Sequence, residues 1–435
     1  MAGGATSRLG VPWGRGSTAH TCSIYPFSVH RPLTAAGVLV GIDMLSGDGF
    51  CWDPFEAYTE GLVANPNVAI FGQPGQRKST LVKTYLARMF ALYRQRWVGI
   101  TDPKGEYTAL AEHLGLDVIR LFPGGMTRVN PLAPGPAARH ESADQTAMRR
   151  ADNVRDLIGA VLQRELNPGE EAILYAAVAE LLARRTDEPT LADLASLLAD
   201  PTEAIADRVR QPSDQVAADA VDLYYALSSL LGHSLRGMFD GPSTVDLAVD
   251  GRGVVLDLSG LDPSSRAMPL VLMAATAWLQ EFLACPGRQR IQVIDELWLG
   301  AGDRHFVRHV QRCQKLGRTY GVANIQIAHK ITDAPAQADD GRAESKIAAG
   351  LLADCDTKII LRQDPEQLSP AQQAFGLTDT ERTWIGSLAR GRALWLLGGH
   401  RAVVQHHLAE HEKPLVDTDF RMREVADDDV MEGDE

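Results

Sequence analysis

One stretch of sequence constrains this chain more than any other. Residues 71–80 read FGQPGQRKST, follow the apolar run 67–70, and precede residues 81–97, which predict an amphipathic helix. A strand, a glycine-rich turn, a lysine with a hydroxyl, and a helix together form the layout of a phosphate-binding loop. In such a loop the backbone N–H groups and the helix N-terminus face a polyphosphate, the lysine reaches its outer oxygens, and the hydroxyl ligates Mg²⁺.

The pattern G-x-x-x-x-G-K-[ST] fails at one position, where Arg77 stands in place of the glycine before the lysine. An arginine there is sterically costly if φ is positive, whereas it fits and adds a charge if φ is negative. We predict that nucleotide binding survives and that Arg77 weakens turnover. The predicted nucleotide-binding residues are Gly72, Gln73, Pro74, Gly75, Gln76, Arg77, Lys78, Ser79 and Thr80.

A second chemical motif follows a later apolar run. Residues 290–294 predict a buried strand that leads into Asp295 and Glu296. P-loop enzymes hold Mg²⁺ with the loop hydroxyl and with an acid at the end of a neighbouring strand. Ser79 and Asp295 are therefore the predicted metal ligands, and Glu296 is predicted to polarise the water that attacks the γ-phosphate. The two motifs together predict ATP and Mg²⁺ as the cofactors.

Two further residue types suit the same chemistry. Gln326 closes the next predicted strand, where an amide can sense the γ-phosphate or orient the water, or can simply be a polar strand-end residue. Arg318, Arg390 and Arg392 each suit either a finger acting in trans on the phosphate or an ordinary surface position. We favour Arg390 because it directly precedes a predicted hairpin. The predicted catalytic residues are Lys78, Glu296, Gln326 and Arg390.

Strands and helices alternate around both motifs, which predicts parallel βαβ units and an α/β fold with ligands at the carboxyl ends of the strands. Between them, helical spacing of apolar residues predicts an all-helical insertion, interpreted as a packing lobe. The predicted segments are a disordered tail at 1–24, the first part of the ATPase domain at 25–136, the insertion at 137–240, the second part at 241–415, and an acidic tail at 416–435.

Composition excludes several other classes. The 435 residues carry a net charge of −13, so no chain-wide basic signature for nucleic acid exists, although a ring can confine basic residues to its pore. The five cysteines form no C-x-x-C pair, which disfavours a zinc site or disulfide framework. No signal peptide is evident, and the apolar run 270–284 is too short to span a membrane. We therefore expect a cytoplasmic protein without a transmembrane segment.

Several motifs in a fixed order resemble one family. They are the phosphate loop with the following LVKTY, then DPKGEY at 102–107, NPL at 130–132, VIDELW at 293–298 and NIQ at 324–326. Their order, with a helical insertion before the Asp-Glu strand, is similar to that of the TraC-like conjugative type IV secretion ATPases of the HerA/FtsK superfamily. The resemblance covers roughly residues 25–410.

The resemblance implies a RecA-like motor with helices on both faces of its sheet. Such a motor hydrolyses ATP, usually as a hexameric ring, and energises DNA or protein transfer at the cytoplasmic face of a membrane channel. The family's lysine and hydroxyl match Lys78 and Ser79, its acids match Asp295 and Glu296, and its glutamine matches Gln326. The chain departs from the family pattern at Arg77, and we expect no long N-terminal domain for docking to a secretion channel.

Three functions follow as hypotheses. The first is an ATP-driven motor for conjugative or secretion transport, with channel components or DNA as partners and peripheral membrane association through those partners. The second is a double-stranded DNA translocase of the HerA/FtsK type. The third is a hydrolysis-deficient nucleotide-binding scaffold, of which Arg77 would be the signature.

Overall fold

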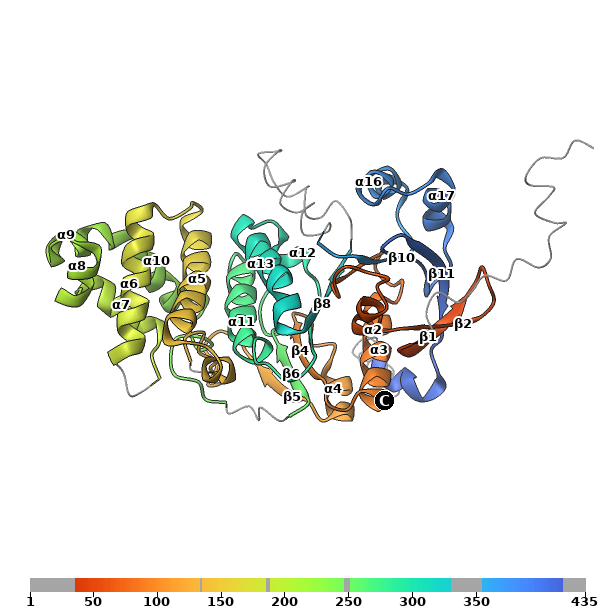
Figure 1. The fold of residues 1–435 in the computed structure, drawn as a ribbon, viewed down its shortest axis with the longest axis horizontal. Coiled ribbons are helices and arrows are strands. Elements are labelled where there is room, and N and C mark those ends of the chain that lie inside the picture. Colours follow the sequence, from red (N-terminus) through yellow and green to blue (C-terminus); the bar gives the residue numbers. More distant parts are fainter. Residues whose placement is uncertain (1–35, 134, 185–187, 246–250, 330–353, 418–435) are drawn as a thin grey trace, which may run out of the picture.

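A computed structural model describes residues 36–133, 135–184, 188–245, 251–329 and 354–417 (Figure 1). The N-terminal tail predicted at 1–24, and the acidic tail from residue 418 onward, lie outside these described residues. The described part contains one eleven-stranded sheet in the order β2-β1-β11-β10-β9-β3-β8-β7-β4-β6-β5. Its strands are β1 (Val38–Asp43), β2 (Gly49–Trp52), β3 (Val68–Phe71), β4 (Trp97–Asp102), β5 (Asp117–Arg120), β6 (Gly253–Asp257), β7 (Arg290–Ile294), β8 (Val322–Ala328), β9 (Thr357–Ile360), β10 (Arg392–Leu397) and β11 (His400–His406).

The sheet has a parallel part and an antiparallel part. The strands from β9 to β5 run parallel, so their carboxyl ends meet at one edge, hereafter the carboxyl edge. The remaining strands, β10, β11, β1 and β2, are antiparallel and extend the sheet on the side of β9. The hairpin predicted after Arg390, formed by β10 and β11, is confirmed, and β1 and β2 form a second hairpin.

Helices cover both faces of the sheet, which confirms the predicted fold class. Successive residues of β3 point to opposite faces, so Ile70 packs with α3 (Lys78–Leu92) and α4 (Thr108–Leu114), while Phe71 belongs to the core on the other face. That second core includes α11 (Ala267–Leu283) and α13 (Arg304–Tyr320). Two separate hydrophobic cores therefore hold the sheet between them.

An all-helical insertion follows β5, as predicted. Its helices are α5 (Ala143–Leu162), α6 (Pro168–Arg184), α7 (Leu191–Ala199), α8 (Glu203–Val209), α9 (Ser213–Asp219) and α10 (Val221–Ser229). They form the yellow and green end of the molecule, and α5 joins them to α11 and α13 (Figure 1). The remaining helices are α2 (Pro54–Thr59), α12 (Trp298–Ala301), α16 (Pro365–Phe375), α17 (Asp379–Ser387) and α18 (Lys413–Val416).

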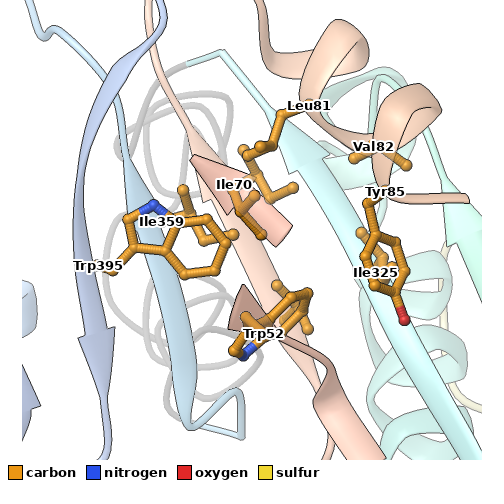
Figure 2. Close-up of a pocket in the computed structure, with 10 residues that line it drawn as sticks. Trp52, Ile70, Leu81, Val82, Tyr85, Ile325, Ile359 and Trp395 are labelled. Carbon is orange, nitrogen blue, oxygen red and sulfur yellow. The ribbon is translucent and has the colours of Figure 1, made fainter. Parts of the chain in front are cut away.

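The antiparallel strands fix the elements that flank the phosphate loop. Trp52 and Trp395 lie beside Ile70 of β3, and Leu81 and Tyr85 of α3 complete a small apolar cavity (Figure 2). The ring centroids of Trp52 lie 5.3 Å from Tyr85 and 5.2 Å from Trp395. Such aromatic contacts add to the free energy of burial. This packing holds β3 and α3, and hence the loop between them, in one position.

Two element boundaries differ from the predictions. Helix α3 ends at Leu92, because the chain turns before β4 begins at Trp97. Strand β8 continues to Ala328, so Gln326 lies inside the strand and does not close it. The ladder explains this: Phe71, the last residue of β3, still pairs with Ala328. Of the described helices, none combines the length and apolar character needed to cross a membrane.

Candidate nucleotide site

The loop between β3 and α3 has the backbone of a phosphate-binding loop. A side chain on Gly72 would clash with Leu361, 2.8 Å from the added Cβ, so glycine is needed where β9 passes. Gly75 has a φ of 77°, which glycine adopts readily. The Gln73 N–H donates to the Arg362 carbonyl at 3.1 Å. Pro74 is exposed, whereas Gln76, Ser79 and Thr80 are half-buried.

Arg77 has the costly backbone conformation. Its φ is 74° and its ψ is 34°, in the left-handed region, at the N-cap position of α3. An L-residue there costs about 1 kcal/mol relative to glycine. Its side chain lies against Gly391, where a Cβ would be 3.4 Å from the arginine Cδ. The alternative of a negative φ is therefore wrong, and the side chain extends toward the start of β10.

Lys78 is buried, with 6% of its surface exposed, and its ammonium is held by the loop itself. The Nζ atom donates to the carbonyls of Gly72 at 2.7 Å and Gln73 at 3.1 Å, and lies 3.1 Å from Nδ1 of His329. Neutral carbonyls are weaker acceptors for an ammonium than phosphate oxygens are. The lysine is thus positioned where it can exchange these contacts for a polyphosphate.

Asp295 directly follows β7 and is buried, with one oxygen accepting from the Glu296 N–H at 2.9 Å. Burial, together with the charges of Glu296, Glu106 and Asp102, raises the pKa of Asp295 to about 7. The described residues contain no group of three His, Cys, Asp or Glu side chains that could hold a metal. A magnesium–nucleotide site needs no such group, because Mg²⁺ is bound by one or two carboxylates and by substrate phosphates. Asp295 and Ser79 fit that donor set.

The Glu296 carboxylate is held from three sides. Its Oε1 accepts from Lys104, and its Oε2 accepts from the Trp298 indole and lies 2.6 Å from Nε2 of His329. Its backbone has a φ of 55°, which turns the side chain out of the line of β7. Burial on its own raises the pKa of this carboxyl, but His329 and Lys104 together lower it to about 2. Glu296 is therefore fully ionised at neutral pH.

Lys104 and His329 are the site residues that the sequence reasoning missed. Lys104 comes shortly after β4, and His329 directly follows β8. Strand β8 lies between β3 and β7, and β4 lies on the other side of β7. Ligands bind at the carboxyl ends of parallel strands, so the positions of Lys104 and His329 just after predicted strands could have identified both residues.

Gln326 and Arg390 lie elsewhere than the sequence suggested. Gln326 pairs with Ala69 and Ile294 inside the sheet, and among the described residues neither atom of its buried side-chain amide has a hydrogen-bond partner. His329, instead, occupies the strand end. Arg390 donates from Nε to the Gly75 carbonyl at 2.9 Å, so within a single chain it already contacts the loop.

Comparison with known proteins bears on the fold that carries these residues. No family model matches the chain, and no curated protein matches it. VirB4 of Thermoanaerobacter pseudethanolicus superposes with a TM-score of 0.69 at 20% identity, over 88% of this chain and 100% of that one. The unbound bacterial conjugative coupling protein TrwB gives 0.55 at 16% identity, over 87% and 90%. The chain has the fold of VirB4 and TrwB.

This shared fold extends to nucleotide-bound structures. TrwB in complex with ADP and Mg²⁺ gives a TM-score of 0.54 at 15% identity, over 94% of this chain and 99% of that one. The RecA-like sheet that the sequence implied is thereby confirmed, as the fold that this chain shares with VirB4 and with the conjugative coupling protein TrwB.

Proposed function

We propose that this chain is a Mg²⁺-dependent ATPase that energises DNA or protein transfer in a type IV secretion-like conjugation system. One observation carries the proposal: Lys78 of the loop and Glu296 after β7 both contact His329, so the phosphate-binding cation and the water-activating acid meet at one point of the carboxyl edge. TrwB, which shares the fold, is a plasmid coupling protein whose structures contain ADP with Mg²⁺ and an ATP analogue.

Each residue then has a role in hydrolysis. Backbone N–H groups of the loop and Lys78 bind the β- and γ-phosphates of ATP. Ser79 and Asp295 would hold Mg²⁺, which would supply positive charge beside the phosphate oxygens. Glu296 accepts the proton of the attacking water. Arg390, which touches Gly75, positions the loop or acts on phosphate charge across a subunit boundary.

The assembly and location are proposed from the same fold. A hexameric ring would bring Arg390 near a neighbouring site and would confine basic residues to a pore, despite the acidic net charge of −13. We place the protein in the cytoplasm, or at the inner face of the membrane through secretion-channel partners.

A second candidate is a double-stranded DNA translocase, which the likeness to a conjugative coupling protein favours. The two differ in what stimulates turnover. Duplex DNA added to the purified chain should accelerate hydrolysis by a translocase, whereas co-purification with channel components supports the secretion motor. A non-hydrolysing scaffold is the third candidate, supported by the positive φ of Arg77.

Phosphate release by the purified chain tests the ATPase proposal. We expect slow hydrolysis of ATP that depends on Mg²⁺ and stops when EDTA removes the metal. Omission of Mg²⁺ serves as the matched control. Tight ATP binding without any release of phosphate would contradict the ATPase and favour the scaffold.

A further inference from the structure

We propose that His329 is a positioning residue that couples the binding of phosphate by Lys78 to the release of Glu296. This proposal rests on the ATPase function above. The imidazole lies between the two, with Nδ1 3.1 Å from Lys78 Nζ and Nε2 2.6 Å from Glu296 Oε2. The ring therefore links the lysine of the loop to the acid that follows β7.

The chemistry of the three groups fixes the direction of each hydrogen bond. A lysine ammonium only donates, so Nδ1 of His329 must accept from Lys78. The ring proton therefore sits on Nε2 and is donated to Glu296. A neutral imidazole has one donor and one acceptor, so the hydrogen bond that Nδ1 accepts determines that Nε2 is the donor.

Both carboxylate oxygens of Glu296 already accept hydrogen bonds in this arrangement. Its Oε2 accepts from both His329 and Trp298, and its Oε1 accepts from Lys104. Both lone pairs of Oε2 are therefore used. A carboxylate whose oxygens already accept these hydrogen bonds is a poor acceptor for a proton from water. Glu296 must lose at least one donor before it can act as a base.

Binding of the ATP phosphates to Lys78 would start the release of Glu296. Charged phosphate oxygens attract Lys78 more strongly than the carbonyls of Gly72 and Gln73 or the ring nitrogen of His329. When Lys78 turns to the phosphate, Nδ1 loses its donor and the ring is no longer fixed. The contact between Nε2 and Oε2 then loosens, which frees Glu296 for the water only when a nucleotide is present.

Gln326 is not placed for this role. It lies inside β8, at the level of Ala69, and its amide atoms have no hydrogen-bond partner in the part of the chain that the structure describes. His329 is the first residue beyond that strand, and its side chain is 19% exposed, so it faces the opening of the site.

Trp298 provides a readout that does not require turnover. Its indole N–H donates to Glu296, and its ring lies 6.1 Å from the His329 ring in an edge-on arrangement. Release of Glu296 should therefore change the tryptophan emission. The chain has seven tryptophans, so a Trp298→Phe variant identifies the part of the signal that comes from Trp298.

The experiment compares wild type, His329→Leu and His329→Gln, with the exposed His400→Leu as a matched control on the distant β10–β11 turn. Glutamine restores one donor and one acceptor, whereas leucine has neither. Because His329→Leu removes one donor from Glu296 permanently, we expect its kcat to equal or exceed that of wild type with KM changed less than about threefold, and glutamine to restore wild-type behaviour. Binding of a non-hydrolysable ATP analogue with Mg²⁺ should change Trp298 emission in wild type and in His329→Gln, but not in His329→Leu.

The outcomes separate this proposal from the ATPase itself. An emission change of equal size in wild type and His329→Leu, a loss of kcat in that variant, or a glutamine variant that behaves as leucine does would each overturn the coupling. A wild type that binds the analogue without hydrolysing ATP overturns only the ATPase, because the emission still decides the coupling. A wild type that binds no nucleotide overturns both.

Discussion

Two groups of buried charges in this molecule are built in different ways. At the carboxyl edge, Glu296 is held by Lys104 and His329, whose side chains are 42% and 19% exposed. At the junction between insertion and core, Glu281 of α11 is held by Arg149 and Arg150 of α5, and no side chain there is more than 11% exposed. The second group lies between helices α5 and α11, which pack side by side (Figure 1), while the first lies at the carboxyl edge of the sheet.

This difference in the exposure of the partner side chains suits the Glu296 group to function and the Glu281 group to stability. A buried charge is stable only with its partners, and partners enclosed by helices cannot be exchanged for solvent or ligand. Partners at an open edge can be exchanged, and the acceptors of Lys78 are neutral groups that a phosphate would replace. We therefore expect mutations at the edge to reduce turnover and mutations at the junction to reduce stability.

The largest expected effect is at the edge. Lys78→Ala removes the phosphate-binding cation, and Glu296→Gln removes the base, so each should lower kcat at least about 100-fold. Steady-state phosphate release measures this, and thermal melting should show little loss of stability. The exposed Lys413→Ala is the matched control. Unchanged turnover in either variant would contradict a functional role for the carboxyl edge.

The next effect is at the junction. Glu281→Gln leaves Arg150 buried without its counter-charge and Arg149 with Glu141 alone, which should cost about 3 kcal/mol of unfolding free energy. Urea unfolding measures it, with the exposed Glu410→Gln as control. Turnover per folded molecule should stay within about twofold of wild type, because the site is not touched. A large loss of kcat without loss of stability would contradict a purely structural junction.

A matched pair of arginines sharpens the comparison. Arg77 at the edge and Arg210 in the insertion both have left-handed backbones, with φ of 74° and 58°. Replacing either by glycine should raise the unfolding free energy by up to about 1 kcal/mol. Only Arg77→Gly should also raise turnover, by about tenfold, if Arg77 slows hydrolysis. If turnover does not change, Arg77 is harmless to the reaction.

The smallest effect concerns Arg390. Its hydrogen bond to the Gly75 carbonyl is exposed, so Arg390→Ala should cost about 1 kcal/mol or less and raise KM for ATP up to about fivefold. Mixing variant and wild-type subunits distinguishes this from a finger acting in trans. A loss of kcat near 1,000-fold, rescued by mixing with active-site mutants, would show the trans role instead.

Local patterns in the sequence predicted much of the fold. The strand before the loop, the helix after it and the two hairpins follow from short runs of apolar residues and turn glycines, and the structure contains all of them. The parallel sheet with a helical insertion follows from the alternation of such runs. Lys78, Asp295 and Glu296 were identifiable because each stands directly beside its own strand or helix in sequence.

The backbone conformation of Arg77, unlike these elements, could not be predicted from local sequence patterns. Residue type restricts φ without fixing it, and arginine strongly prefers a negative value. The loop closes onto α3 with a φ of 74° because β3 and α3 are held in place by packing on both sides. That strain becomes visible only once the flanking elements are positioned.

The sequence by itself determined which elements form and which loop has the phosphate-binding pattern, because those signals lie within a few residues of one another. The tertiary structure decided which side chains meet at that loop. Lys104, His329 and Glu296 are far apart in the chain, and the strand order β3-β8-β7-β4 brings them together. Strand order depends on long-range pairing and core packing, and so the partner of the glutamate is His329 at the end of β8, with Gln326 enclosed in the strand.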